Sequence, residues 1–319
     1  MNYKKAGVDI EASGRIKGFI GKLAEGTYSE RVIKGIGPFA SLFKLEGYKK
    51  PVLVSSVDGV GTKLKIADAL SRLDVVGVDI VHHCVNDILT CGAKPLFFLD
   101  YIAMDKLSPD KVLMIVDGIT RACLDLNLPL VGGELAEMPG IYRKGNFDLV
   151  GFIVGVCEEG EILPRDIKAG DKIIGLPSSG LHTNGFSLVR KIFGERREEL
   201  SVFIPELGGN LADELLKTHR CYFKELYPKL AKIKGMAHIT GGGIEGNLRR
   251  ILPPGLSAYI DARAWEIPPI FRLIEERGKV PREEMFRVFN MGIGMIVIGD
   301  IEGMEIGEVR KGEGVFIDF

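Results

Sequence analysis

Acidic, basic and glycine residues come together in a segment that could hold a phosphate group and a divalent cation. The segment Asp58-Gly59-Val60-Gly61-Thr62-Lys63 directly follows a run of strand-forming residues, 51–57. The carboxylate could hold a hard cation, Gly59 and Gly61 would let backbone N–H groups face phosphate oxygens, and the lysine could neutralise them. The spacing of a Walker A loop is absent, and Leu64 stands where a dinucleotide-binding loop needs its third glycine. A plain glycine turn between a strand and a helix would give the same pattern, so both interpretations stay open.

A second group of oxygen ligands lies on one side of a predicted helix, 75–91. Asp79 and Asn86 are seven residues apart and therefore almost superimposed two turns along, with Asp87 beside them. Carboxylate and amide oxygens suit magnesium, whereas the adjacent histidines at 82–83 would suit a transition metal. We do not favour a metal–histidine site, because no further His or Cys stands at ligand spacing. An ordinary solvent-facing side of the helix explains the polar residues equally well.

Two further segments place reactive side chains beside glycine. Glu134 follows Gly132-Gly133 at the predicted end of a short strand, 128–132, which puts a carboxylate next to flexible backbone. The segment 178–185 gathers His182, Thr183 and Asn184 before a predicted helix, 186–193, whose N–H groups and dipole favour anions. The alternative for this second segment is a helix that is simply capped by Thr183 or Asn184.

A run of three glycines precedes another predicted helix. His238-Ile239-Thr240-Gly241-Gly242-Gly243 leads into a helix that begins near Ile244. Three consecutive glycines at this place are seldom explained by packing alone, so the turn could form a second nest of anion-binding amides.

The scaffold that must position these residues alternates strands with helices. Apolar runs of strand length predict strands at 51–57, 96–104, 128–132, 149–157, 172–176, 257–260 and 292–298. Helical patterns predict helices at 75–91, 108–126, 185–193, 211–230 (as two), 244–251, 269–277 and 282–289. The fold class is therefore α/β (α+β). A chain of 319 residues exceeds one ordinary domain, and the polar, turn-rich stretch 158–171 predicts two domains, 1–165 and 166–319.

Composition excludes several classes of protein. Lysine plus arginine total 42 against 43 for aspartate plus glutamate, so no general attraction to nucleic acid or anionic membranes is expected. No apolar stretch approaches the ~20 residues of a membrane span, and none near the start has the length of a signal peptide. The five cysteines, Cys84, Cys91, Cys123, Cys157 and Cys221, include no C-x-x-C pair, which argues against a disulfide framework or a zinc ribbon. We expect a cytoplasmic protein with reduced thiols.

Taken together, the motifs resemble those of the phosphoribosylformylglycinamidine cyclo-ligase (aminoimidazole ribonucleotide synthetase) family, in order and over essentially the whole chain. The resemblance is carried by these segments: 3–10 (YKKAGVDI), 58–63 (DGVGTK), 84–88 (CVNDI), 95–101 (PLFFLDY), 132–134 (GGE), 136–140 (AEMPG), 179–185 (SGLHTNG), 238–243 (HITGGG) and 289–292 (FNMG).

The resemblance implies a two-domain fold in which the sheets of the N-terminal domains meet across a homodimer, with ATP and Mg²⁺ bound at the junction of the two domains. It also implies the reaction: formylglycinamidine ribonucleotide plus ATP gives aminoimidazole ribonucleotide, ADP and phosphate. Phosphorylation would make the formyl amide oxygen a good leaving group, and the amidine nitrogen of the same molecule would expel it as the five-membered ring closes. Positioning and charge neutralisation would supply most of the catalysis.

The resemblance also implies roles for individual residues. The acids and amide that would organise magnesium or phosphate are Asp58, Asp79, Asn86, Asp87 and Glu134. Residues that would bind the nucleotide are Gly35 and Gly37 of a glycine-rich loop, Asp58, Gly59, Gly61, Thr62, Lys63 and the turn Gly241, Gly242 and Gly243. Residues that would contact the transferred phosphoryl group or the substrate phosphate are His182, Thr183 and Asn184, with Lys63 neutralising ATP.

Other ATP-using members of the superfamily, and a non-catalytic nucleotide-binding subunit, are the alternatives. Selenophosphate synthetase would need a reactive cysteine or selenocysteine in the N-terminal loop, but no cysteine precedes Cys84. The hydrogenase-maturation relative ends in a cysteine, whereas this sequence ends in Phe319. A silent subunit would have lost acids or the lysine from these motifs, and none is lost.

Overall fold

The computed structural model describes residues 10–319, so the segment 3–9 of the family motifs lies outside the described residues. Contacts divide the chain into two units, which are described separately. Among the described residues, unit 1 comprises 10–88 and 94–159, and unit 2 comprises 89–93 and 160–319. The domain boundary expected between residues 165 and 166 stays a prediction.

Unit 1 is built on a four-stranded sheet. Its strands are β3 (Pro51–Gly59), β4 (Lys94–Met104), β5 (Leu130–Glu137) and β6 (Phe147–Glu158), in the order β3-β6-β4-β5. The strands β4 and β5 run parallel, while β6 is antiparallel to both β3 and β4. A short antiparallel pair, β1 (Val32–Lys34) and β2 (Leu42–Phe43), flanks the loop that carries Gly35 and Gly37.

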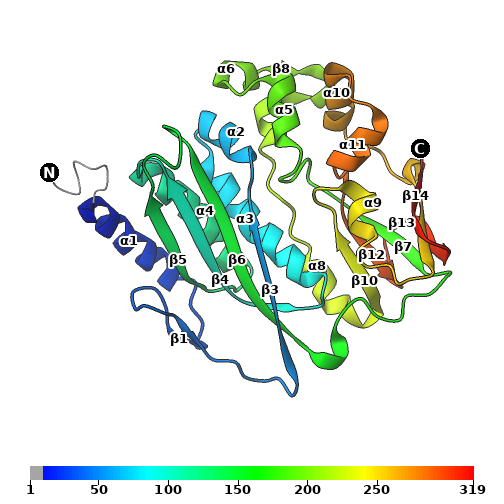
Figure 1. Ribbon diagram of the computed structural model, residues 1–319, viewed down its shortest axis with the longest axis horizontal. Coiled ribbons are helices and arrows are strands. Elements are labelled where there is room, and N and C mark those ends of the chain that lie inside the picture. Colours follow the sequence, from blue (N-terminus) through cyan, green and yellow to red (C-terminus); the bar gives the residue numbers. More distant parts are fainter. Residues whose placement is uncertain (1–9) are drawn as a thin grey trace. The chain divides into compact units, whose positions relative to one another are not determined.

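Helices cover one face of this sheet (Figure 1). The helices α2 (Lys63–Ala69), α3 (Leu73–Leu89) and α4 (Pro109–Asp125) follow β3 and β4 in the chain, and α1 (Ile10–Glu25) packs against α4 and β5. Buried residues Ile80 and Cys84 of α3 lie against Gly151 of β6, where a larger residue would collide with both side chains. The alternation of apolar and polar residues thus places one side of α3 in the core.

Unit 2 is built on a six-stranded sheet. Its strands are β7 (Lys172–Pro177), β10 (Ile233–His238), β11 (Leu256–Asp261), β12 (Ile293–Gly299), β13 (Met304–Lys311) and β14 (Gly314–Asp318), in the order β10-β12-β7-β13-β11-β14. Only β11 and β14 are parallel neighbours. Every residue of β12 is buried, which fits its position inside the sheet and its unbroken apolar sequence.

Short helices surround this sheet. They are α5 (Phe186–Phe193), α6 (Arg197–Leu200), α7 (Leu211–Leu215), α8 (Phe223–Leu226), α9 (Gly243–Leu248), α10 (Pro269–Gly278) and α11 (Arg282–Val288). Short 3-10 turns are η2 (Glu159–Glu161), η3 (Pro205–Leu207), η4 (Tyr227–Lys232) and η5 (Ala262–Ala264), and β8 (Phe203–Ile204) pairs with β9 (Gly209–Asn210). A core of Leu176, Tyr222, Met236 and Met295 fixes β7, β10 and β12 to the segment before α8.

The predicted α/β (α+β) class is confirmed, and the predicted helices at 75–91 and 108–126 are confirmed as α3 and α4 with shifted ends. One local expectation is wrong: Gly132-Gly133-Glu134 lies within β5 rather than at a strand end. The two helices expected within 211–230 are present as the short helices α7 and α8, which a non-helical link, 216–222, separates. Helix α5 begins after Gly185, with no side-chain cap, so neither Thr183 nor Asn184 caps it.

Within residues 10–319, none of the helices combines the length and the apolar character that a membrane crossing requires.

Candidate functional site

Two carboxylates of unit 1 converge on one buried histidine. Asp58, at the end of β3, lies 2.9 Å from His83 Nε2 through its Oδ2 atom, and Asp87 Oδ2 lies 3.7 Å from the same nitrogen. Ser56 donates its hydroxyl hydrogen to Asp87 Oδ2 over 2.9 Å, and the backbone N–H of Gly59 donates to Asp58 Oδ1 over 2.6 Å. Strand β3 and helix α3 therefore assemble an acidic group whose oxygens remain partly exposed.

The charges in this group hold each other in the ionised form. Burial by itself would lower the pKa of His83, but the hydrogen bond to Asp58 and the charges of Asp87, Asp58 and Asp79 raise it above its usual value. Burial would raise the pKa of Asp58, and the interactions with His83 and Gly59 outweigh it, so that this pKa is lowered. Asp58 is therefore a carboxylate at neutral pH, which is the form that can bind magnesium.

Lys63 and Asp79 form a closed ion pair beside this group. Lys63 Nζ lies 2.7 Å from Asp79 Oδ2, and both side chains are 0% exposed. Burial lowers the pKa of Lys63, and Asp79 only partly offsets that effect. Asn86 is also fully buried. The polar side of α3 is therefore not the solvent-facing surface that was one of the two sequence interpretations, and the phosphate and metal roles of these three residues stay predictions.

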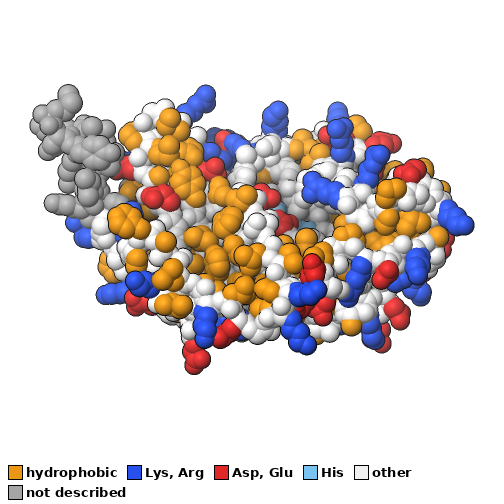
Figure 2. All heavy atoms as spheres, turned by 60° about the horizontal axis from the view of Figure 1, so that its bottom comes forward, with side chains coloured by type: hydrophobic (Ala, Val, Ile, Leu, Met, Phe, Trp, Pro, Cys, Tyr) orange, Lys and Arg blue, Asp and Glu red, His pale blue; other side chains and the backbone are white. Residues whose placement is uncertain are grey.

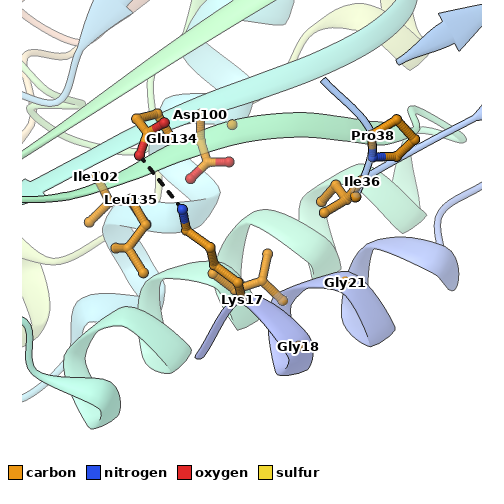
Figure 3. A pocket seen from close by; sticks show the side chains of 12 residues that line it. Lys17, Gly18, Gly21, Ile36, Pro38, Asp100, Ile102, Glu134 and Leu135 are labelled. Atoms are coloured by element: carbon orange, nitrogen blue, oxygen red, sulfur yellow. Dashed lines mark ion pairs between the residues drawn. The ribbon is translucent and has the colours of Figure 1, made fainter. Parts of the chain in front are cut away.

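A separate cavity of about 490 Å³ opens in unit 1. It lies between α1, strands β4 and β5, and the loop that carries Gly35 and Gly37, which we call the glycine loop. Figure 3 shows Lys17 of α1 pointing towards Glu134 of β5, with Asp100 of β4 beside them. Lys17 Nζ is 4.0 Å from Glu134 Oε1, and both side chains are more than half exposed, so the pair adds little stability. Gly37 and Glu134 line this cavity, and both also line an adjoining hollow together with Gly35. The structure thus brings the glycine loop and Glu134 together.

Asp100 is the carboxylate in this cavity that sequence reasoning missed. Burial raises its pKa to about 7, and only its own backbone N–H counteracts the effect. Gly133 on the neighbouring strand makes the close approach possible, because a Cβ there would lie 2.3 Å from Asp100 Oδ1. Without knowledge of the β4–β5 pairing, the sequence offers no sign of this environment.

The face of the unit 1 sheet that the helices do not cover carries exposed apolar side chains. Val57 pairs with Phe152 across β3 and β6, and their side chains are 61% and 40% exposed. Leu53, four residues before Val57 and therefore on the same face, is 62% exposed. Figure 2 shows hydrophobic side chains gathered in the left half of its view. We call Leu53, Val57 and Phe152 the open sheet face.

In unit 2 the predicted segment 178–185 forms a tightly held loop. His182 has a φ of +59°, which is rare for a residue with a side chain. Asn290 fixes the loop: its Nδ2 donates to the Gly180 carbonyl over 2.9 Å, and the Ser178 hydroxyl donates to its Oδ1 over 3.1 Å. His182 and Thr183 are buried. Sequence reasoning gave Asn290 no role, although the family segment 289–292 contains it.

The triple-glycine turn lies next to this loop. A Cβ on Gly241 would be 3.6 Å from Asn184 Oδ1, so the two predicted segments meet. Asn247 of α9 donates its side-chain N–H groups to carbonyls of the turn, including that of Gly243 over 2.8 Å. Packing also requires glycine at position 243, because a Cβ there would be 1.7 Å from the Phe286 carbonyl oxygen. The expectation that packing does not explain the glycines is therefore wrong for this one.

Three histidines of unit 2 lie together beside these turns. His182, His219 and His238 are buried, and their ring nitrogens lie within 4.8 Å of one another. His219 comes from the link 216–222, which separates the two helices α7 and α8, and the sequence motifs gave it no role. His219 is a weak sequence signal, because it is a single histidine whose partners, His182 and His238, are remote in the chain.

The comparisons with known proteins agree on one family. Residues 40–157 match the N-terminal domain, and residues 168–317 the C-terminal domain, of the family described as AIR synthase related protein. A protein of Thermoanaerobacter pseudethanolicus named phosphoribosylformylglycinamidine cyclo-ligase is 51% identical over 303 residues, covering 94% of this chain and 90% of that protein. Another of that name, from Carboxydothermus hydrogenoformans, is 51% identical over 317 residues, covering 98% of this chain and 92% of the other.

A solved structure supports the fold. The crystal structure of thiamine-monophosphate kinase from Stenotrophomonas maltophilia K279a superposes with a TM-score of 0.68 at 17% identity, covering 93% of this chain and 95% of that one. At this identity the likeness shows the fold alone.

Proposed function

Because this chain belongs to the phosphoribosylformylglycinamidine cyclo-ligase family, we propose that it converts formylglycinamidine ribonucleotide and ATP into aminoimidazole ribonucleotide, ADP and phosphate in purine biosynthesis. The observation that carries the proposal is the 51% identity to relatives of that name over 94% and 98% of the chain. The predicted acids, lysine, histidine and glycine turns of the motifs are all present.

In the proposed reaction, the γ-phosphoryl group moves from ATP to the formyl amide oxygen and leaves ADP. The amidine nitrogen then attacks the activated carbon, the ring closes, and the former formyl oxygen departs within phosphate. Since the nucleophile and the electrophile belong to one molecule, the protein must chiefly hold reacting atoms in line and neutralise charge.

Unit 1 offers the groups for the nucleotide and a cation. Asp58 of β3 and Asp87 of α3 fit Mg²⁺, because both offer partly exposed carboxylate oxygens that meet beside His83. Bound Mg²⁺ would neutralise triphosphate oxygens. The glycine loop and Glu134 line the cavity that we assign to part of the nucleotide. Lys63 would act through the buried pair with Asp79, which fixes the start of α2 behind the segment 58–62.

Unit 2 offers the groups for the transferred phosphoryl group or the substrate phosphate. His182, Thr183 and Asn184 lie on the loop fixed by Asn290, and Asn184 lies beside Gly241 of the glycine turn. The carbonyls of that turn are turned towards Asn247, while Gly241 and Gly242 are exposed, an arrangement suited to amide donors facing an anion.

The protein is further proposed to be a cytoplasmic homodimer. The open sheet face exposes Leu53, Val57 and Phe152 side by side, and apolar surface of this kind is favoured at interfaces between subunits.

The test is ATP hydrolysis measured with and without formylglycinamidine ribonucleotide. The proposal expects phosphate release to depend on the ribonucleotide and to match aminoimidazole ribonucleotide formation one to one. Phosphate release that is indifferent to the ribonucleotide would reject it.

A further inference from the structure

His219 joins two histidines of the family motifs without belonging to either motif. Its Nε2 atom lies 2.9 Å from Nε2 of His238, and its ring stacks on that of His182 with centroids 3.9 Å apart and planes inclined by 22°. All three rings are buried, with His219 completely enclosed. A buried polar ring in a non-helical link requires partners of this kind, because an isolated one would destabilise the fold.

The stacking favours a shared proton over a shared metal ion. A zinc ion bound by three histidines needs their in-plane lone pairs to point at one position about 2.0–2.1 Å from each nitrogen. The nearly parallel rings of His182 and His219 direct their lone pairs into two adjacent planes instead. The short distance between His219 and His238 already equals that of an N–H···N hydrogen bond.

The hydrogen bond limits where protons can sit. If both Nε2 atoms carried hydrogen, the two hydrogens would occupy one gap of 2.9 Å, and if neither did, two lone pairs would face each other. One ring therefore donates and the other accepts. The accepting ring carries its own proton on Nδ1, so each ring of the pair is restricted to one tautomer at a time.

His182 is held by the same segment of chain. Its Nε2 accepts hydrogen bonds from the backbone N–H groups of Ser179, at 3.3 Å, and Arg220, at 3.5 Å. These donors require a lone pair on Nε2, which leaves the proton of the neutral ring on Nδ1. The link 216–222 thus reaches His182 twice, through the N–H of Arg220 and through the ring of His219.

We propose that His219 is a positioning residue for the reaction inferred above: it shares one proton with His238 between their Nε2 atoms and supports the ring of His182 by stacking. The two motif histidines are thereby held in fixed orientations beside the glycine turn and the 178–185 loop. The effect on turnover rests on the proposed function, whereas the shared proton does not.

The shared proton is tested directly by NMR of the full chain labelled with ¹⁵N at histidine. We expect one protonated and one unprotonated Nε2 in the pair, connected by a scalar coupling through the hydrogen bond. His219→Gln and His238→Gln assign the two signals, and His82→Gln, which changes a histidine of unit 1, should leave both in place. Two protonated or two unprotonated Nε2 atoms would overturn the proposal. So would equimolar Zn²⁺ displacing the bridging proton and shifting all three rings together.

Two substitutions separate hydrogen bonding from packing. His219→Phe keeps a ring to stack on His182 but removes the nitrogen, whereas His219→Gln keeps a donor or acceptor near the Nε2 position and removes the ring. We expect His219→Phe to lower kcat at least about tenfold, with KM values for ATP and the ribonucleotide within about twofold, and His219→Gln to restore kcat to within about threefold of the original.

Equal losses in both variants, or a rise in KM alone, would show a merely structural role and overturn the proposal. Unchanged turnover of His219→Phe would do the same. If His219→Phe does not fold, the Gln variant and the NMR spectrum of the unaltered chain still decide. If the chain lacks cyclo-ligase turnover, the proposed function fails while the NMR result still reports on the shared proton.

Discussion

At the scale of single residues, the charge of Asp58 is the clearest target. Asp58→Asn keeps the shape of the side chain and removes the charge that faces His83 at 2.9 Å. We expect kcat to fall about 100-fold at saturating Mg²⁺. Stability should change by less than about 1 kcal/mol, since the side chain is half exposed. Steady-state kinetics and thermal unfolding measure the two effects.

A matched control is Asp117→Asn, which removes an exposed aspartate of α4 that pairs with Arg121. It should leave kcat unchanged. Full activity of Asp58→Asn at saturating Mg²⁺, or an equal loss in both variants, would contradict the proposed role of Asp58.

Asp100 should make stability depend on pH. Its pKa is about 7 in the folded chain against 3.8 for the unperturbed group, so the folded state holds the proton more tightly. The protonated Asp100 side chain therefore contributes its full share to the free energy of unfolding in acid, and this contribution declines as the pH rises from about 4 to about 7. After allowance for partial solvent access, we expect the decline to be about 2 kcal/mol.

The comparison is thermal unfolding of the original chain and of Asp100→Asn across this pH range. The asparagine cannot ionise, so the difference in stability between the two proteins should grow with pH in favour of the variant. Parallel curves would show that the carboxyl of Asp100 titrates normally.

The sequence could predict which residues belong to the site where a local motif contains them. It could not predict the surroundings of those residues in the folded chain. The segments containing Asp58, His182 and Gly241 stood out through local glycine and polar patterns. By contrast, the closed pair of Lys63 with Asp79, the raised pKa of Asp100 and the stacking of His219 depend on pairing between segments remote in the chain. No local pattern encodes those distances.

At the scale of elements, Gly133 sets the spacing between β4 and β5. In Gly133→Ala the added Cβ would lie 2.3 Å from Asp100 Oδ1 and 2.7 Å from the Asp100 carbonyl oxygen. Because backbone must move to relieve the second contact, we expect a loss of about 2 kcal/mol, measured by chemical denaturation.

The matched control is Gly14→Ala, in helix α1, where a Cβ would meet nothing within 4 Å. That change should leave stability equal or slightly raised, since alanine favours helix. Tolerance of Gly133→Ala to the same degree would mean that the two strands are not so closely constrained.

Elements with strong periodicity were predictable, and those determined by tertiary contacts were not. The apolar stripe of α3 and the Ser-Pro start of α4 gave their positions within a few residues. Two helices were expected within 211–230, but the position and length of the link 216–222 between them were not, because its residues are held by contacts to the 177–182 segment, such as the Tyr222 hydroxyl donating to the Pro177 carbonyl over 2.9 Å.

At the scale of the whole molecule, the open sheet face is expected to be covered by a second copy. Val57→Asp introduces a charge at its centre and should convert a dimer into a monomer at micromolar concentration, as measured by analytical ultracentrifugation. Val202→Asp, at an exposed position of unit 2, should leave the dimer intact. A monomeric original chain, or a dimer that persists in Val57→Asp, would contradict the assignment.

The family, the fold class and the two-unit organisation could be predicted, because the motifs of the family occur in the same order along essentially the whole chain. What the sequence could not supply is how the predicted residues are grouped: Asp58 and Asp87 around His83, Glu134 with the glycine loop, and Asn184 with Gly241. Each grouping follows from strand register or from a loop that another segment fixes.

The proposed function depends above all on one step, in which ATP phosphorylates the formyl oxygen before the ring closes. The most direct measurement uses formylglycinamidine ribonucleotide with ¹⁸O in the formyl group and follows the label by mass spectrometry of the released phosphate. We expect one ¹⁸O in each phosphate molecule formed. Phosphate without label, with the ¹⁸O appearing in water, would contradict it.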